Sequence, residues 1–253
     1  MAEECEYRAL FAVDVERSAG RGGPAFLRVR EALSAALRES FRRSGIDWDG
    51  CLCDDLGDGL RVTAPAGLPK ARLIHPLVHE LDARLRAHNE LAGPLTRVRV
   101  RVALHAGEVH VSPDGRVTGR PLEVLARLLD SAPLRRALAR APEAATALVV
   151  SQHFHEETVC PGRPGIDPAS FHATPVTEKE YTGSAWLHVP GHRDPAPAPA
   201  AARPARPAEG PRPAPDDRPG AGRVTMKNRA SGNAVVNALQ NGTQYVRVGG
   251  GGE

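Results

Sequence analysis

The chain has 253 residues, enough for one globular domain and a further segment, since domains cluster near about 100 to 150 residues. Residues 190–253 carry nine Lys or Arg and five Asp or Glu, so the net charge of +3 arises there and residues 1–189 carry −1. A domain that binds nucleic acid concentrates basic residues on its folded part, so this distribution argues against nucleic acid as a partner.

The N-terminal segment MAEECEYRALFAVD has neither the basic start nor the apolar stretch of a secretory signal, and no apolar run approaches the length of a membrane span. We therefore expect a cytoplasmic protein that does not cross a membrane. Thiols stay reduced in that compartment, so we expect free cysteines at positions Cys5, Cys51, Cys53 and Cys160. Cys51 and Cys53 are expected to be buried on one side of a strand rather than to bind zinc.

The first half of the chain predicts a strand, a helix and a hairpin. Residues 7–15 (YRALFAVDV) are almost continuously apolar, which predicts a buried strand entering a loop. Residues 24–45 place apolar side chains at helical spacing, with a proline at the start and a glycine at the end. Residues 48–65 contain two short strand-like runs around Gly-Asp-Gly, which predicts a hairpin.

The second half continues the alternation of helices and strands. Residues 69–91 predict another helix, and residues 97–111 (RVRVRVALHAGEVHV) predict a strand, a tight turn at Ala-Gly and a further strand. Residues 122–129 predict a third helix, and the runs ATALVVS and SAWLHVP predict later strands. This order predicts an α+β fold, with a ferredoxin-like, antiparallel-rich sheet that has helices on one face.

The chain changes character after the last predicted strand. Residues 190–223 contain ten of the 23 prolines and no Val, Ile, Leu or aromatic residue, so they cannot form a core and predict a disordered Pro/Ala-rich linker. Residues 224–253 restore β-branched residues together with Asn, Gln and Gly, a composition that favours stacked strands. We therefore expect a folded domain at 1–189, a linker at 190–223 and a C-terminal motif at 224–253.

Two aspartates are candidates for chemistry. Asp14 ends an apolar strand, where a charge is costly, and Asp58 lies at the tip of the predicted hairpin. If the first strand lies beside that hairpin, the two carboxylates converge and can hold magnesium for phosphate chemistry. Asp58-Gly59 is equally a preferred turn dipeptide, and Asp14 can cap the next element, so the residues alone leave both interpretations open.

Four segments in this order resemble the class III nucleotidyl cyclases, the family of adenylate and guanylate cyclase catalytic domains. The resemblance covers residues 7–150, and its segments are FAVDVERSAG, LGDGLRV, RVRVALHAGEVHV and GRPLEVLARLLD. By this resemblance, Asp14 and Asp58 would bind two Mg²⁺ or Mn²⁺ ions, and Arg127 would stabilise charge on the transferring phosphate across a homodimer interface. The backbone amides of Val15, Glu16, Arg17 and Ser18 would bind phosphate, as a strand-to-helix loop can.

Three positions depart from the family pattern. Glu123 stands four residues before Arg127, where the family usually has Asn near the ribose. Asp54 and Arg116 stand at the two positions that select the base, and neither fits the adenine pattern. These departures leave the base open and also leave open whether the domain turns over its nucleotide.

The C-terminal residues NRASGNAVVNALQNGTQYV loosely resemble the short motifs of bacterial amyloid signalling systems. The resemblance implies β-stacking through residues such as Val235, Val236 and Gln240, on other copies or on a signalling partner with a related motif. The alternative is an unstructured, glycine-rich end without a partner.

Three hypotheses follow. The first is an active cyclase that converts a nucleoside triphosphate to a cyclic nucleotide and pyrophosphate. Its tail would recruit it to a signalling assembly, which in one version serves defence. The second is a cyclase-like domain that binds nucleotide without turnover and acts as a sensor, scaffold or effector. The third gives the tail the main function, with the folded domain as its passenger or effector.

Overall fold

The structure, a computed structural model, describes residues 4–192. The predicted linker beyond residue 192 and the C-terminal motif, including Val235, Val236 and Gln240, lie outside the described residues. No helix within the described part is both long enough and apolar enough to cross a membrane.

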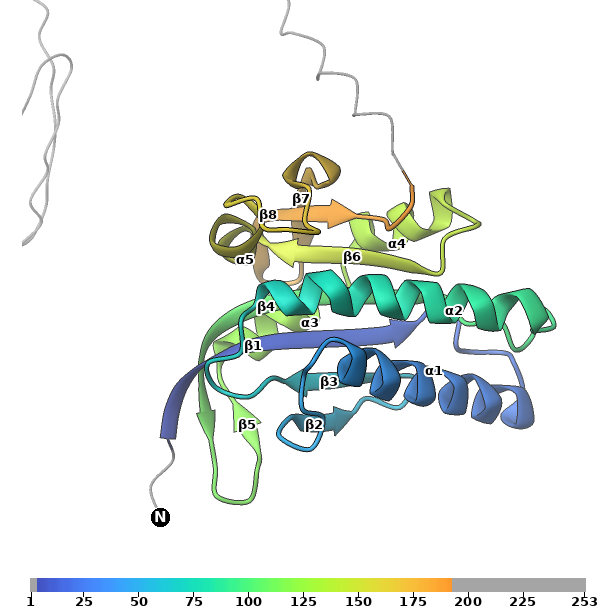
Figure 1. Ribbon diagram of the computed structural model, residues 1–253, viewed down its shortest axis with the longest axis horizontal. Coiled ribbons are helices and arrows are strands. Elements are labelled where there is room, and N and C mark those ends of the chain that lie inside the picture. The colour runs from blue at the N-terminus through green and yellow to red at the C-terminus, as the bar shows by residue number, and fades with distance from the viewer. Residues whose placement is uncertain (1–3, 193–253) are drawn as a thin grey trace, which may run out of the picture. The chain divides into compact units, whose positions relative to one another are not determined.

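An eight-stranded sheet forms the centre of the described region, with strand order β2-β3-β1-β4-β6-β8-β7 and with β5 paired to β4 (Figure 1). β4 and β6 run parallel, and the other neighbouring pairs are antiparallel. The predicted α+β class with an antiparallel-rich sheet is therefore confirmed. The strands are β1 (Glu4–Val15), β2 (Leu52–Asp55), β3 (Gly59–Thr63), β4 (Val100–Val111), β5 (Val117–Thr118), β6 (Thr146–Ser151), β7 (His172–Glu178) and β8 (Tyr181–His188).

The helices pack on both faces of this sheet, so the prediction that they lie on one face is wrong. Figure 1 shows α1 (Gly23–Arg43) and α2 (His79–Leu91) in front of the sheet and α3 (Arg120–Leu129) behind it. The physical reason lies in β1, where Phe11 and Val13 join the core under α1 and α2, and Leu10 and Ala12 join the core with α3 and α4 (Ala132–Arg140). A strand that is apolar at successive positions must be covered on both sides.

Short helical segments complete the described chain. An irregular helical segment, η1 (Leu73–Val78), is interrupted by non-helical backbone at His75 and leads directly into α2. The helix predicted at 69–91 therefore forms with an irregular first part. After β6 the chain makes α5 (Gln152–Phe154), η2 (His155–Val159) and η3 (Pro168–Ser170). The sequence patterns did not predict α4 or β7.

The predicted turn at Ala106-Gly107 does not form. β4 continues through both residues and pairs with β1 along its whole length, from Glu4 opposite Val111 to Val15 opposite Val100. Gly107 serves a different purpose, because a Cβ there would lie 2.7 Å from Cγ of Pro121 at the start of α3. The glycine therefore allows α3 to pack closely on the strand.

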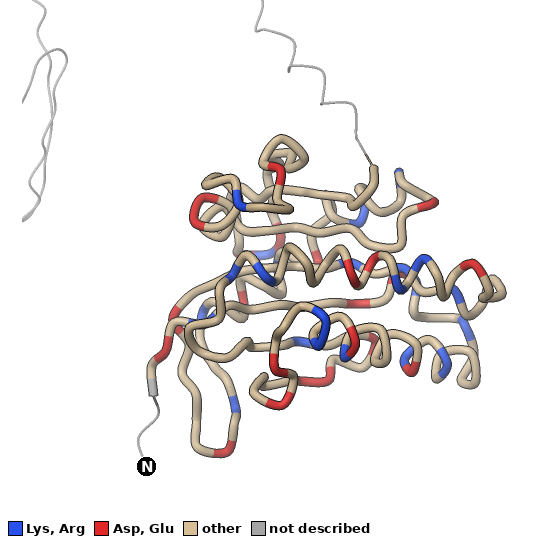
Figure 2. Tube along the Cα trace, in the orientation of Figure 1, with Lys and Arg blue, Asp and Glu red and all other residues tan. Residues whose placement is uncertain are grey.

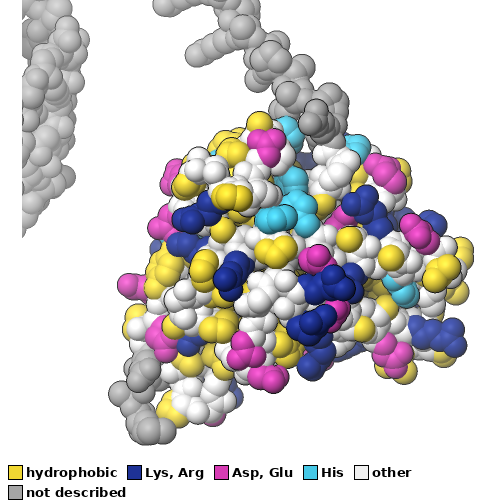
Figure 3. All heavy atoms as spheres, in the orientation of Figure 1, with side chains coloured by type: hydrophobic (Ala, Val, Ile, Leu, Met, Phe, Trp, Pro, Cys, Tyr) yellow, Lys and Arg dark blue, Asp and Glu magenta, His cyan; other side chains and the backbone are white. Residues whose placement is uncertain are grey.

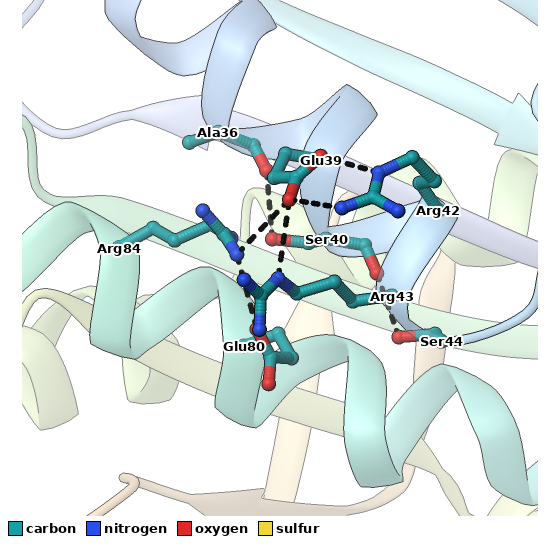
Figure 4. Close-up of polar contacts among 8 residues, drawn as sticks. All are labelled: Ala36, Glu39, Ser40, Arg42, Arg43, Ser44, Glu80 and Arg84. Carbon is teal, nitrogen blue, oxygen red and sulfur yellow. Dashed lines mark hydrogen bonds and ion pairs between the residues drawn. The ribbon is translucent and has the colours of Figure 1, made fainter.

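The two front helices are also joined by charged side chains. Figure 4 shows Glu39 of α1 accepting hydrogen bonds from Arg42 and Arg43 of its own helix, and pairing with Arg84 of α2 at 3.5 Å. These contacts are partly exposed, so they add little to stability beyond the apolar core beneath them. Acidic and basic positions are interspersed along both helices (Figure 2).

All four cysteines are free, as predicted. Cys51 is buried, and burial raises the pKa of its thiol to about 12. Cys53 is exposed, which corrects the expectation that both thiols are buried, because β2 is the edge strand of the sheet.

Candidate functional site

The structure brings Asp14 and Asp58 together at one end of the sheet. β1 lies between β3 and β4, and Asp14 pairs with Gly59, the residue that follows Asp58. The amide of Val15 donates a hydrogen bond to the backbone carbonyl of Asp58 at 3.1 Å. Two residues 44 positions apart in the chain are therefore held next to each other by β-sheet pairing.

Asp14 is engaged by an arginine on the neighbouring strand. Nε and Nη2 of Arg101 donate hydrogen bonds to Oδ1 and Oδ2 of Asp14 at 2.8 and 2.6 Å. Burial raises the pKa of the Asp14 carboxyl to about 6, with Arg101 acting in the opposite direction and the charge of Asp58 raising it further. The carboxylate is thus held as half of an ion pair in a site where only 8% of the residue is exposed.

Asp58 faces the loop that follows β1. Oγ of Ser18 donates a hydrogen bond to Oδ2 of Asp58 at 2.7 Å, which ties the loop to the hairpin. Arg17 adopts a left-handed backbone conformation with φ of 51°, a conformation that lets the chain turn sharply after the strand. The loop is therefore shaped by the hairpin that carries Asp58.

The amides predicted to bind phosphate divide into two pairs. The amides of Val15 and Glu16 already donate to the carbonyls of Asp58 and Arg99, at 3.1 and 2.8 Å, so these two are not available for phosphate. The sheet extends its hydrogen bonding to these residues, which is the physical reason for this correction. The amides of Arg17 and Ser18 have no acceptor within residues 4–192 and remain the candidates for an anion.

Arg127 lies in the last turn of α3 and pairs with a glutamate of the β7–β8 turn. Nε and Nη2 of Arg127 donate to Oε1 of Glu180 at 3.2 and 2.7 Å, and this contact raises the pKa of Arg127. In the described part of the chain, Arg127 makes no contact with Asp14 or Asp58. Asp130, at the end of α3, is close enough to raise the pKa of Asp14 and of Arg127.

The predicted base-selecting residues are not in contact with each other in the described residues. Asp54 on β2 accepts hydrogen bonds from Nε and Nη2 of Arg61 on β3, at 3.0 and 2.9 Å. Arg116 lies in the turn between β4 and β5, where its amide donates to Oδ1 of Asp114 at 3.3 Å. Glu123 is exposed on α3, one helical turn before Arg127.

The donor set at Asp14 and Asp58 fits a hard divalent cation. Magnesium is commonly held by one or two carboxylates together with water and substrate phosphates. These two residues lie at the same end of the sheet, close enough for the charge of Asp58 to raise the pKa of Asp14. Among the residues that the structure describes, no three His, Cys, Asp or Glu side chains are grouped closely enough to hold a metal by themselves. A cation here would therefore depend on oxygen atoms brought by the substrate and would compete with Arg101 for Asp14.

Histidines form a separate feature on the face that carries α2. Figure 3 shows several histidines gathered on this side, and the rings of His75 and His188 lie 5.0 and 6.0 Å from that of His79. Burial lowers the pKa of His188 to about 4, so its ring is neutral at physiological pH. These side chains pack against one another rather than toward Asp14, which points to the opposite face.

Arg101 and Asp130 are residues near Asp14 that the motifs did not single out. Arg101 had a usable signal, because strict alternation over 97–102 places it on one face of a strand. Its partner could not be named without the register, which sets Arg101 directly opposite Asp14. Asp130 has no comparable signal in the sequence.

Comparison with known proteins shows a shared fold but only limited sequence similarity. No protein-family model matches the chain. A stretch of 77 residues, 30% of this chain, is 39% identical to part of the serine/threonine-protein kinase pkn2 of Myxococcus xanthus. That match covers 9% of the kinase, so this chain spans less than a tenth of its length.

Three solved structures share the architecture described above. An adenylate/guanylate cyclase/hydrolase from Silicibacter pomeroyi matches 75% of this chain and 99% of its own, with a TM-score of 0.54 and 19% identity. The catalytic core of a rhodopsin-guanylyl cyclase with converted specificity, solved with ATPαS, matches 74% and 98%, with a TM-score of 0.50 and 12% identity. A bacterial light-regulated adenylyl cyclase matches 74% and 52%, with a TM-score of 0.50 and 13% identity.

Proposed function

We propose that this protein has the fold of a nucleotidyl cyclase and also its activity, converting a nucleoside triphosphate to a cyclic nucleotide and pyrophosphate. The observation that carries the proposal is the pairing of β1 with β3, which places Asp14 and Asp58 together at the end of the sheet. The similarity to solved adenylate and guanylate cyclase domains supports this assignment.

In the proposed reaction the ribose 3′-hydroxyl loses its proton to solvent, its oxygen bonds to the α-phosphorus, and the bond from that phosphorus to pyrophosphate breaks. Two divalent ions, when bound, would neutralise the triphosphate and make the ribose hydroxyl more acidic. Asp14 and Asp58 would hold them, Asp14 after its contact with Arg101 is loosened. The amides of Arg17 and Ser18 would donate to phosphate oxygens, at a loop already held in place by the contact between Ser18 and Asp58.

Arg127 is proposed to act on a second copy of the chain. In its own chain it is paired with Glu180 and contacts neither aspartate. A homodimer would bring Arg127 of one copy to the phosphates held by the other, and would need to replace the contact with Glu180.

The experiment that tests the proposal is incubation of the purified protein with ATP, GTP, CTP or UTP and Mn²⁺, with products read by mass spectrometry. We expect one or more cyclic nucleotides from the wild-type protein and none from Asp14→Ala or Asp58→Ala. Asp49→Ala is the matched control, since Asp49 is an exposed aspartate outside the site. Wild-type product formation by either site variant would contradict the assignment of these aspartates.

A second candidate function is nucleotide binding without turnover. Two contacts favour it: Asp14 is already paired with Arg101, and Arg127 is already paired with Glu180. Glu123, which stands where the family usually has Asn, also favours it. Under this function the wild-type protein would bind a fluorescent triphosphate analogue in the presence of Mn²⁺ yet release no cyclic product. Measurement of binding and product in the same sample distinguishes the two functions.

The C-terminal motif is proposed to recruit the domain to a signalling assembly. The proposal rests on its Asn, Gln and valine content following a segment that cannot form a core. A partner with a related motif would then stack on residues 224–253.

A further inference from the structure

A cavity of about 230 Å³ lies between α1 and the β2–β3 hairpin. It opens on the α1 face of the sheet, whereas Asp14 has the same strand parity as Leu10 and Ala12 and so points to the opposite face. The cavity is therefore separate from the candidate site, although Asp58 and Gly59 form part of its rim.

One side of the cavity is apolar and firmly held. Leu33 and Leu37 of α1 are buried in the core, and Leu60 of β3 packs against that core. Trp48 closes the cavity with its indole ring fixed edge-on against Phe41, at 4.9 Å between ring centroids. This lining suits a flat, apolar body about the size of one aromatic ring.

The charged side chains on the rim differ in the partners they have. Arg30 pairs with Asp55 at 2.5 Å, and Asp58 accepts a hydrogen bond from Ser18. Arg38 stacks over the ring of Trp48 at 5.2 Å and, within residues 4–192, makes no hydrogen bond or ion pair. Its guanidinium is therefore an unpaired cation beside an apolar cavity with an aromatic wall.

An unpaired guanidinium can bind a carboxylate through two parallel hydrogen bonds. The nearby carboxylates of Asp55 and Asp58 disfavour a ligand with two or more negative charges. We propose that this cavity binds a small aromatic carboxylate, with Arg38 on the carboxylate and the ring against Leu33, Leu37, Leu60 and Trp48.

The test uses the protein labelled with 5-fluorotryptophan, because the chain has two tryptophans and ¹⁹F NMR reports on each. Trp48→Phe assigns the two signals, Trp48 and Trp186. Benzoate is the probe, benzyl alcohol is the neutral ligand of similar size, and acetate is the carboxylate without a ring. We expect a saturable shift of the Trp48 signal with benzoate, at least about tenfold weaker binding of benzyl alcohol and no saturable shift with acetate.

Two arginine variants decide whether the carboxylate is recognised as proposed. Arg38→Gln should weaken benzoate binding by about tenfold or more, since a charged hydrogen-bonding group is removed. Arg42→Gln is the matched control, one turn further along α1 and paired with Glu39, and should leave binding unchanged. Both arginines are exposed, so circular dichroism is expected to show an intact fold for both variants.

Three outcomes would overturn the proposal: no saturable shift at Trp48, equal binding of benzoate and benzyl alcohol, or equal binding by wild type and Arg38→Gln. None of these outcomes depends on turnover of a nucleotide. Failure here is thus distinguishable from failure of the proposed cyclase activity.

Discussion

The ion pair between Arg101 and Asp14 determines what the candidate site can bind. A buried carboxylate is costly without a partner, and the guanidinium supplies both charge and two hydrogen bonds. The same contact satisfies the atoms that a metal ion would use. The carboxylate therefore has a partner without a cation and, under the proposed function, would exchange Arg101 for a metal ion when substrate binds.

Protonation of Asp14 should limit the proposed activity at low pH. Its pKa in the folded protein is about 6, above the ordinary value of 3.8, so the ionised form is lost as pH falls through about 6. We expect product formation at subsaturating Mn²⁺, where proton and cation compete for Asp14, to decline below that pH. A profile that stays flat down to pH 5, where the fold is shown to persist, would contradict this role of Asp14.

Replacement of Arg101 should shift the pH at which product formation declines. Arg101 favours the ionised form of Asp14, so Arg101→Gln is expected to raise the pKa of the carboxyl and shift the acid limb of the activity profile to higher pH. Arg97→Gln is the control, because Arg97 belongs to the same alternating segment and lies outside the pair. Comparison of the two pH profiles is the measurement, and identical acid limbs would refute the coupling.

At the scale of elements, the contact between β4 and α3 is tightly specified near the site. α3 carries Glu123 and Arg127, and its first turn packs on β4 where Gly107 leaves room for Pro121. The position of this helix also sets the distance from Asp130 to Asp14. A change at Gly107 is therefore expected to affect both stability and the geometry of the site.

Gly107→Ala should destabilise the fold by about 1–3 kcal/mol, because a Cβ at this position would be 2.7 Å from Pro121 and the helix would have to move. Gly93→Ala is the control, since a Cβ there meets no atom within 4 Å. Urea denaturation followed by circular dichroism measures both. Equal midpoints for Gly107→Ala and wild type would show that α3 can shift at little cost.

At the scale of the whole molecule, the separation of Arg127 from the aspartates leads to a test of the dimer. Asp14→Ala and Arg127→Ala proteins should each be inactive, and mixing them should restore about a quarter of wild-type activity. About half of the dimers would then be mixed, and each would contain one intact site. Absence of rescue after subunit exchange has been demonstrated would argue against a shared site.

The C-terminal motif gives a second prediction at this scale. A peptide of residues 224–253 should form thioflavin-positive fibrils with a repeat near 4.7 Å, because its Asn, Gln and valine residues can satisfy their backbone groups by stacking. Proline at Val235, Val236 or Gln240 should slow or stop assembly by removing a backbone donor. A peptide that stays monomeric at high concentration, even with seeds of a related motif, would favour an unstructured end.

Local patterns were sufficient for most of the elements around the candidate site. The apolar run before Asp14, the Gly-Asp-Gly turn at Asp58 and the helical spacing of residues 24–45 each predicted an element that the structure contains. These signals are local, since a strand, a hairpin turn and an amphipathic helix are specified by neighbouring residues. The resemblance of four ordered segments likewise pointed to the fold shared with cyclase domains.

Only the tertiary structure decided the contacts between segments distant in the chain. Alternation in residues 97–111 gave no indication that Arg101 faces Asp14 or that β4 continues through Gly107, because both follow from the register with β1 and the packing of Pro121. Two further contacts are equally non-local. Arg127 pairs with Glu180, and the amides of Val15 and Glu16 donate to carbonyls of neighbouring segments. Sequence determined which chemical groups are present, and strand register and helix packing determined which of them already have partners.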